Sequence, residues 1–265
     1  MLRMLMVVLL GLPLAVGVRA GDPKSRTNPT PQWQRLLTGA DARKADELNK
    51  RIDELVNADR YAEAIRAAEE QLALRTKVQG TDHWQTVDVK WELAALKRVT
   101  ALPKEKRLGW RKARQGAGEA QGLVQRAQYA KALPLKLEVL KWCREVVGED
   151  HPHTAASYNN VAANLNAQGK YVEAGPLFQK ALDILLKALG EEHPDTALGY
   201  NNVAANLDDQ GKHAEATPLY QKALDIWRKV LGEEHPDTAT GYNSVAFNGQ
   251  MPVDAEHGKD GKASC

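Results

Sequence analysis

The sequence has few cysteines and no long apolar run. Its 265 residues include two cysteines, Cys143 and Cys265, too few for the disulfide framework of a small secreted domain. The sequence neither requires nor excludes a single disulfide bond between these two cysteines. No apolar run reaches the roughly 18–20 residues that a membrane-spanning helix needs. With 43% hydrophobic and 26% charged residues, the composition is that of an ordinary globular chain.

An excess of basic charge is also lacking. The formal net charge is +2, but residues 1–20 contain two arginines and no acid. Leaving them out reduces Lys plus Arg from 36 to 34, which equals the 34 Asp plus Glu. Nucleic-acid binding normally requires a basic footprint, so we expect no nucleic-acid partner.

The first twenty residues have the pattern of an export signal. Arg3 supplies a positive charge, Leu5–Val16 is an apolar stretch, and Val18-Arg19-Ala20 offers small residues for cleavage. We therefore expect a signal peptide over 1–20 and an exported protein, periplasmic or extracellular, with no stable membrane span after cleavage. The alternative is an uncleaved membrane anchor.

The second half of the chain consists of repeats. Residues 151–192 and 193–234 are identical at 30 of 42 positions, and a third copy begins at His235. Divergent half-copies begin upstream at Tyr61 and Tyr129. In each regular copy, apolar residues recur at the i, i+3, i+4, i+7 spacing of two amphipathic helices. A pair of such helices cannot bury both of its faces alone, so the sequence predicts an all-α solenoid of stacked, antiparallel helix pairs.

Breaks in the repeat pattern predict the organisation of the rest. Pro103 should end a helix that opens at His83, and residues 104–127, with four glycines, predict a weak helix. The third copy ends at Phe247, so a helix over 236–247 should expose Tyr242 and Val245. The expected segments are a signal peptide (1–20), an N-terminal linker (21–40), divergent helical repeats (41–127), regular repeats (128–247) and an irregular tail (248–265).

The regular copies resemble the tetratricopeptide-repeat family. The residues that carry the resemblance are Tyr200, Val203, Ala204, Leu207, Ala216, Tyr220 and Ala223, and Tyr158, Val161, Ala162, Leu165, Ala174, Phe178 and Ala181 in the preceding copy. The 42-residue period is similar to the extended repeat of kinesin light chains. The resemblance implies a right-handed superhelical solenoid that binds a protein or an extended peptide on its concave face. We find no catalytic motif and expect neither enzymatic activity nor a cofactor.

Asparagines recur in the first helix of each pair, where a side-chain amide suits hydrogen bonding to a peptide backbone. The candidate groove residues are Asn159, Asn160, Asn164, Asn166, Asn201, Asn202, Asn206, Asp208, Asp209 and Asn243. The family resemblance singles out Asn160 and Asn202. The alternative is that these amides bridge neighbouring helices or are copied by repeat duplication.

A basic cluster precedes the regular repeats. It comprises Lys104, Lys106, Arg107, Arg111, Lys112 and Arg114. Such a cluster indicates an anionic partner, for example a component of the cell envelope. The alternative is a solvated helix face whose charges pair with acids elsewhere.

Two other classes of function stay open. The incomplete copy over 236–247 would suit a structural protein that self-associates through this end. His151 and His153 form the only local histidine cluster and would suit a metal-dependent or enzyme-accessory protein. Since zinc sites usually need three or four convergent ligands, we expect no metal there and a structural role at the repeat joint.

Overall fold

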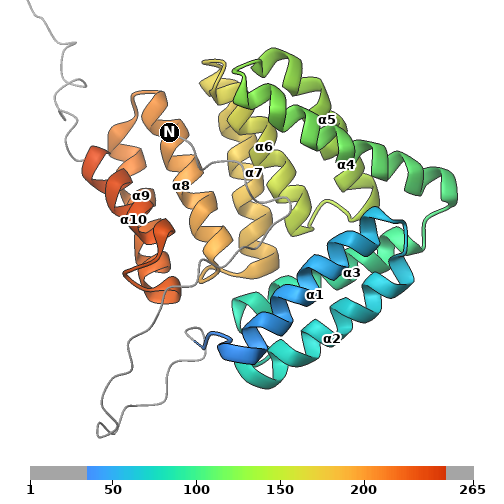
Figure 1. Cartoon of the computed structure of the whole chain (residues 1–265). Helices are drawn as coiled ribbons and strands as arrows, with labels where there is room; N and C mark the ends of the chain where they lie inside the picture. Colours follow the sequence, from blue (N-terminus) through green and yellow to red (C-terminus); the bar gives the residue numbers. More distant parts are fainter. Residues whose placement is uncertain (1–34, 249–265) are drawn as a thin grey trace, which may run out of the picture. The chain divides into compact units, whose positions relative to one another are not determined.

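The computed structural model describes residues 35–248, which fold into ten α-helices with no strand among them. The helices, labelled in Figure 1, are α1 (Gly39–Asn57), α2 (Tyr61–Gln79), α3 (Trp84–Thr100), α4 (Lys104–Gln125), α5 (Tyr129–Val146), α6 (Pro152–Asn166), α7 (Tyr171–Leu189), α8 (Pro194–Asp209), α9 (His213–Leu231) and α10 (Pro236–Asn248). The all-α prediction is confirmed. The predicted signal peptide, most of the predicted linker, nearly all of the predicted tail, and Cys265 lie outside the described residues.

The chain packs as two compact units, which we describe separately. The first ends at Asn160 and the second begins at Val161, inside α6. In the first, α2 packs on α1 and α3, and α4 packs on α5. In the second, α8 packs on α7 and α9, and α9 packs on α10. Over residues 35–248, no helix is both long enough and apolar enough to cross a membrane.

The joints between helix pairs are fixed by hydrogen bonds of a histidine and a threonine. Before α8, the Nδ1 atom of His193 accepts from the backbone N–H of Asp195 at 3.2 Å, and the Thr196 hydroxyl donates to the carbonyl of Gly190 at 2.7 Å. Gly190 has a φ of +84°, a conformation that favours glycine. The same bonds recur at the joints before α6 and α10. These contacts explain why the joint sequence is repeated.

Small residues let the helices of the second unit approach closely. Ala174 and Ala181 in α7 have no exposed surface, and neither do Ala216 and Ala223 in α9. Near the middle of α9, Tyr220 is buried in a cluster with Ala204 of α8. The periodic residues that predicted the helix pairs are therefore the residues that pack them.

The divergent region folds as the breaks predicted. The third helix ends before Pro103, and α4 covers most of 104–127. A Cβ atom at Gly109 would lie 2.3 Å from the Trp142 ring, so this glycine makes room for an aromatic side chain of α5. At Gly118 nothing lies within 4 Å of such an atom. Packing against α5 thus explains Gly109, one of the four glycines. Because glycine has a low helix propensity, the same packing stabilises a helix that is weak on its own.

The single thiol that the structure describes is buried. Cys143 lies on α5, where its Sγ atom accepts a hydrogen bond from the Ser157 hydroxyl at 3.1 Å. Burial raises the pKa of the Cys143 thiol, which keeps it protonated.

The last helix differs from its prediction in one respect. Tyr242 is 44% exposed, as expected, but Val245 is half-buried against the cluster that contains Tyr220. The expectation that Val245 faces solvent is wrong, because this position of α10 packs back on α9. Phe247 is exposed instead, at 61%.

A lysine occupies a core position of the first unit. Lys136 in α5 stands where Phe178 and Tyr220 stand one and two repeats later, and only 6% of it is exposed. No hydrogen bond or ion pair reaches its amine from residues 35–248. Burial lowers the pKa of Lys136 to about 8, because the charged form loses its hydration. The α4–α5 pair therefore carries a destabilising charge that the copies over 151–192 and 193–234 lack.

We expect K136M to raise the free energy of unfolding near pH 7 by up to about 3 kcal/mol, since one pKa unit corresponds to about 1.4 kcal/mol. The folded-state pKa of Lys136 lies below the ordinary lysine pKa of 10.5, so the unfolded chain binds more protons between the two values. The stability of the unchanged protein should therefore rise between pH 8 and pH 10.5, and that of K136M should lack this component. Urea unfolding followed by circular dichroism measures both effects.

The exposed Lys131 on the same helix provides the matched control, and K131M should leave stability and its pH dependence nearly unchanged. Identical unfolding curves for K136M and the unchanged protein across this pH range would contradict the prediction.

Candidate protein-binding surface

Asn206 of α8 fixes this helix to the preceding helix pair. Its Nδ2 atom donates to the Oδ1 atom of Asn166 at 2.8 Å and to the carbonyl of Tyr171 at 2.9 Å. Its own Oδ1 atom accepts from Gln210 at 2.7 Å. Asn206 is 2% exposed. This candidate groove residue therefore bridges helices, which is the alternative that the sequence left open.

The same arrangement recurs one repeat later. The Nδ2 atom of Asn248 donates to the Oδ1 atom of Asp208 at 2.8 Å and to the carbonyl of His213 at 3.5 Å. Its Oδ1 atom accepts from the Thr217 hydroxyl at 2.5 Å. We call these two sets of bonds, centred on Asn206 and Asn248, the asparagine clamp. Sequence reasoning missed Asn248, although its spacing of 42 residues from Asn206 could have revealed it.

Most of the other polar candidates at this end of the helices are also engaged within the protein. Asn164, at the position of Asn206 one repeat earlier, is buried and its Oδ1 atom accepts from Gln168 at 2.8 Å, but its Nδ2 atom has no hydrogen-bond partner among residues 35–248. Asn166 donates to the Oδ2 atom of Asp209 at 2.5 Å, and Asp208 also bonds the ring of His213. The two aspartates that the sequence offered as an acidic end of the groove thus hold neighbouring side chains.

Two adjacent amides of α8 lack such bonds. The Oδ1 atoms of Asn201 and Asn202 are buried and have no hydrogen-bond partner among residues 35–248. Asn201 is half-buried, Asn202 is buried, and Asn243 at the position of Asn201 in the next repeat is exposed. A buried acceptor without a donor costs about 1–3 kcal/mol. These amides are thus the candidates that internal contacts do not explain.

The corresponding amides of α6 belong to the first unit. Asn159 and Asn160 are both half-buried, and the Oδ1 atom of Asn159 is again buried with no hydrogen-bond partner among residues 35–248. Asn159 of α6 and Asn201 of α8 occupy the same position of the repeat, so the buried acceptor without a donor among residues 35–248 recurs in both helices.

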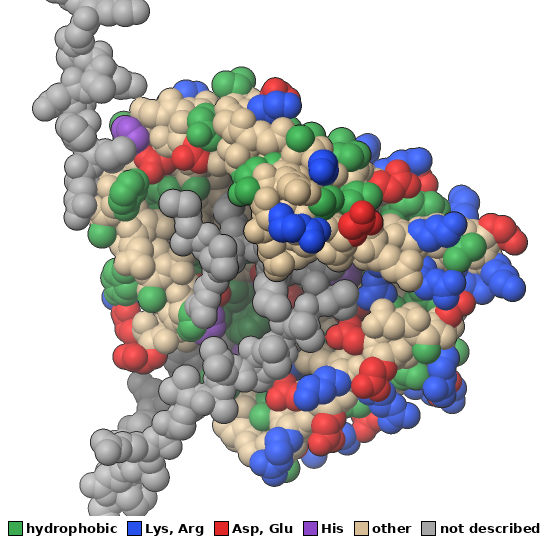
Figure 2. All heavy atoms as spheres, turned by 45° about the horizontal axis from the view of Figure 1, so that its top comes forward, with side chains coloured by type: hydrophobic (Ala, Val, Ile, Leu, Met, Phe, Trp, Pro, Cys, Tyr) green, Lys and Arg blue, Asp and Glu red, His purple; other side chains and the backbone are tan. Residues whose placement is uncertain are grey.

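The basic cluster divides into two sets on α4. Lys104, Lys106 and Lys112 are exposed, whereas Arg107, Arg111 and Arg114 are partly buried. The three arginines follow the i, i+4, i+7 spacing of one helix face, and we call them the arginine row. Figure 2 shows Lys and Arg side chains gathered at the right of the view, with fewer Asp and Glu among them.

The histidine cluster is occupied by structural bonds. The Nδ1 atom of His151 accepts from the backbone of His153, and its Nε2 atom lies 3.2 Å from the carbonyl of Trp91. Burial, and then the neighbouring His153, lower the pKa of His151 to about 4. His153 forms an ion pair with Glu92 at 3.2 Å. Although burial opposes it, this bond raises the pKa of His153. His151 therefore has no ring nitrogen to offer a metal without losing a hydrogen bond.

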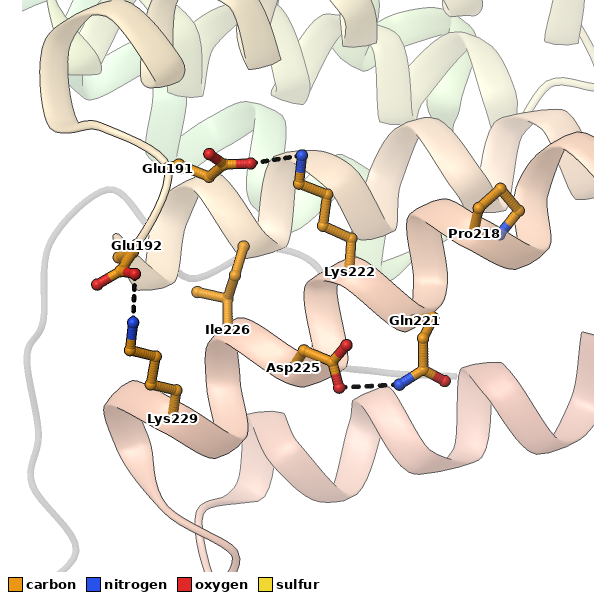
Figure 3. A pocket seen from close by; sticks show the side chains of 8 residues that line it. All are labelled: Glu191, Glu192, Pro218, Gln221, Lys222, Asp225, Ile226 and Lys229. Atoms are coloured by element: carbon orange, nitrogen blue, oxygen red, sulfur yellow. Dashed lines mark hydrogen bonds and ion pairs between the residues drawn. The ribbon is translucent and has the colours of Figure 1, made fainter.

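A hollow of about 430 Å³ lies against α9, with residues of the joint before α8 along its edge. Figure 3 shows that its charged side chains are paired with one another. Lys222 bonds Glu191 at 2.5 Å, Lys229 bonds Glu192, and Gln221 donates to Asp225 at 2.9 Å. The hollow therefore offers no unused charge to a ligand.

The packed helix pairs and their repeated joints define a helical-repeat protein. Residues 119–174, 153–218 and 195–247 match the model of the tetratricopeptide-repeat family. Residues 119–247 therefore consist of tetratricopeptide repeats. Repeats of this family are generally non-catalytic scaffolds for protein–protein interaction.

Two solved structures are similar to this chain. A Podosopora anserina protein described as a kinesin light chain with nearly identical TPR-like repeats is 20% identical, with 81% of this chain and 88% of that chain covered and a TM-score of 0.42. BtubC from P. vanneervenii is 18% identical, with 80% and 84% covered and a TM-score of 0.48. No curated protein matches the chain.

We expect N206A to lower the free energy of unfolding by about 1–3 kcal/mol, because the carbonyl of Tyr171 and the amide of Asn166 lose their donor. Thermal and urea unfolding measure the loss. The exposed Asn243 is the matched control, and N243A should change stability by at most about 0.5 kcal/mol. Equal stability of the two variants would show that the asparagine clamp does not hold the repeats together.

Proposed function

We propose that the protein is an exported, non-catalytic scaffold that binds a protein partner through an extended peptide segment. The single observation that supports this site is the pair of unused amide acceptors at Asn201 and Asn202, on a helix of the tetratricopeptide-repeat region. The proposed location is periplasmic or extracellular, on the basis of the signal-like residues 1–20.

The proposed groove follows the first helices of the pairs, which line the concave face of a solenoid. In the second unit these are α8 and α10, so the ligand segment would contact the half-buried Asn201 and the exposed Asn243, and Asn202, which is 3% exposed, would take part by turning its amide outward on binding. An extended peptide presents a backbone N–H to each side at regular intervals, and an amide can both accept from it and donate to its carbonyls. Asn206 has no part in this groove because the asparagine clamp uses its amide.

A library of displayed random peptides provides the test, since the partner is unidentified. Peptides selected on the unchanged protein should bind N201A/N202A at least about tenfold more weakly, a loss of about 1.4 kcal/mol. Titration calorimetry with the selected peptides measures this difference, and circular dichroism checks that the variant remains helical.

The matched control removes two amides from the exposed sides of α7 and α9, as Q179A/Q221A. This variant should bind the selected peptides as the unchanged protein does. Equal binding by N201A/N202A, or failure to select any peptide, would contradict the proposed groove.

A second candidate function is self-association through the last described helix. Tyr242 of α10 is 44% exposed, whereas Tyr200 at the same position of α8 is 7% exposed. Phe247 adds a second exposed ring. Exposed apolar residues at the end of a solenoid favour contact with a second copy, because terminal repeats normally have a polar outer face.

Light scattering across a wide range of protein concentration distinguishes this candidate from monomeric binding. Self-association should raise the mass with concentration in the unchanged protein and in V172D, whose Val172 is 78% exposed on α7. F247D should remain monomeric, because a buried carboxylate would disfavour the contact. A monomeric mass for the unchanged protein at every concentration would exclude self-association through α10.

A further inference from the structure

The arginine row is held in place by a contact with the preceding helix. Arg107 donates through Nη1 to the carbonyls of Thr100 at 3.1 Å and Leu102 at 3.0 Å, near the end of α3. Trp110, between the first two arginines of the row, is buried with the core residues of the first unit. The helix face that carries the arginines is therefore fixed relative to α3.

The other two guanidinium groups have no partner among residues 35–248. Arg111 and Arg114 are both partly buried, and neither forms a hydrogen bond or an ion pair with any residue of 35–248. Part of each side chain is exposed, and arginine presents five N–H donors in a fixed fork. The two forks can therefore take up an acceptor from a bound ligand.

The acids near Arg114 do not neutralise it. Burial raises the pKa of Asp53 in α1 although the charge of Arg114 opposes this shift, so the two do not form a strong pair. Glu92 in α3 is already bonded to His153. The charge of Arg114 also acts on Tyr61 of α2, whose phenol stays neutral because burial raises its pKa. Arg111 and Arg114 thus retain positive charge on a surface formed by several helices.

We propose that Arg111 and Arg114 form a docking site for an acidic peptide segment, whose carboxylates they bind. Carboxylates match the guanidinium fork and form two parallel hydrogen bonds with it. A protein segment is favoured over a lipid surface because the adjoining repeats belong to a family of protein-binding scaffolds. This site lies in the first unit, so it is independent of the groove proposed for α8 and α10.

Fluorescence anisotropy with a labelled oligo-glutamate peptide tests the proposal. The unchanged protein should bind this peptide and not its oligo-lysine counterpart. R111Q/R114Q should reduce the affinity at least about tenfold, because both forks are lost. K106Q/K112Q removes the same charge from exposed positions of the same helix and should change the affinity by less than about threefold, as expected for surface charges.

The remaining outcomes are also decisive. Equal losses in the two double variants would show binding by diffuse charge and would overturn the site. Absence of oligo-glutamate binding at low salt would overturn it as well, and so would binding of phosphatidylglycerol vesicles in preference to the peptide. If R111Q/R114Q fails to fold, R111K/R114K keeps the charge but not the fork, and an affinity equal to that of the unchanged protein would exclude bidentate binding.

Discussion

The close approach of small residues between amphipathic helices is the constraint on which the rest of the structure depends. A helix pair of this kind buries its apolar faces only against its neighbours. The four alanines of α7 and α9 that have no exposed surface make this contact short. The joint histidine and threonine then fix where each helix begins, through bonds to the backbone. Helix length, repeat period and register all follow from these two requirements.

Much of the fold could be predicted from the sequence because its signals are local. Proline, glycine and the joint motif mark helix ends, and the period of apolar residues marks the packed faces. The prediction for Val245 failed because the pattern does not show how far α10 packs back on α9. The burial of Lys136 could not be predicted from its own helix. It can be inferred only when Lys136 is aligned with Phe178 and Tyr220 of the later repeats.

The candidate site was less predictable than the fold, because identical side chains have different partners. Asn202 and Asn206 lie one helical turn apart, yet one leaves an acceptor unused and the other bonds two neighbouring groups. Likewise, Arg111 and Lys112 are adjacent in sequence, but only the arginine is partly buried. Such differences depend on which groups of the neighbouring helix lie within reach of each side chain. These groups cannot be identified from a single sequence.

The asparagine clamp has a consequence for how the chain can change in length. The copy over 193–234 carries the donor for the copy before it, Asn206, and the acceptors for the copy after it, Asp208 and the carbonyl of His213. A further copy of 42 residues inserted between two existing ones would therefore meet matching groups on both sides. Growth or loss by whole copies of this kind needs no new interface, whereas an insertion of any other length would separate the donor from its acceptors at the junction where it falls.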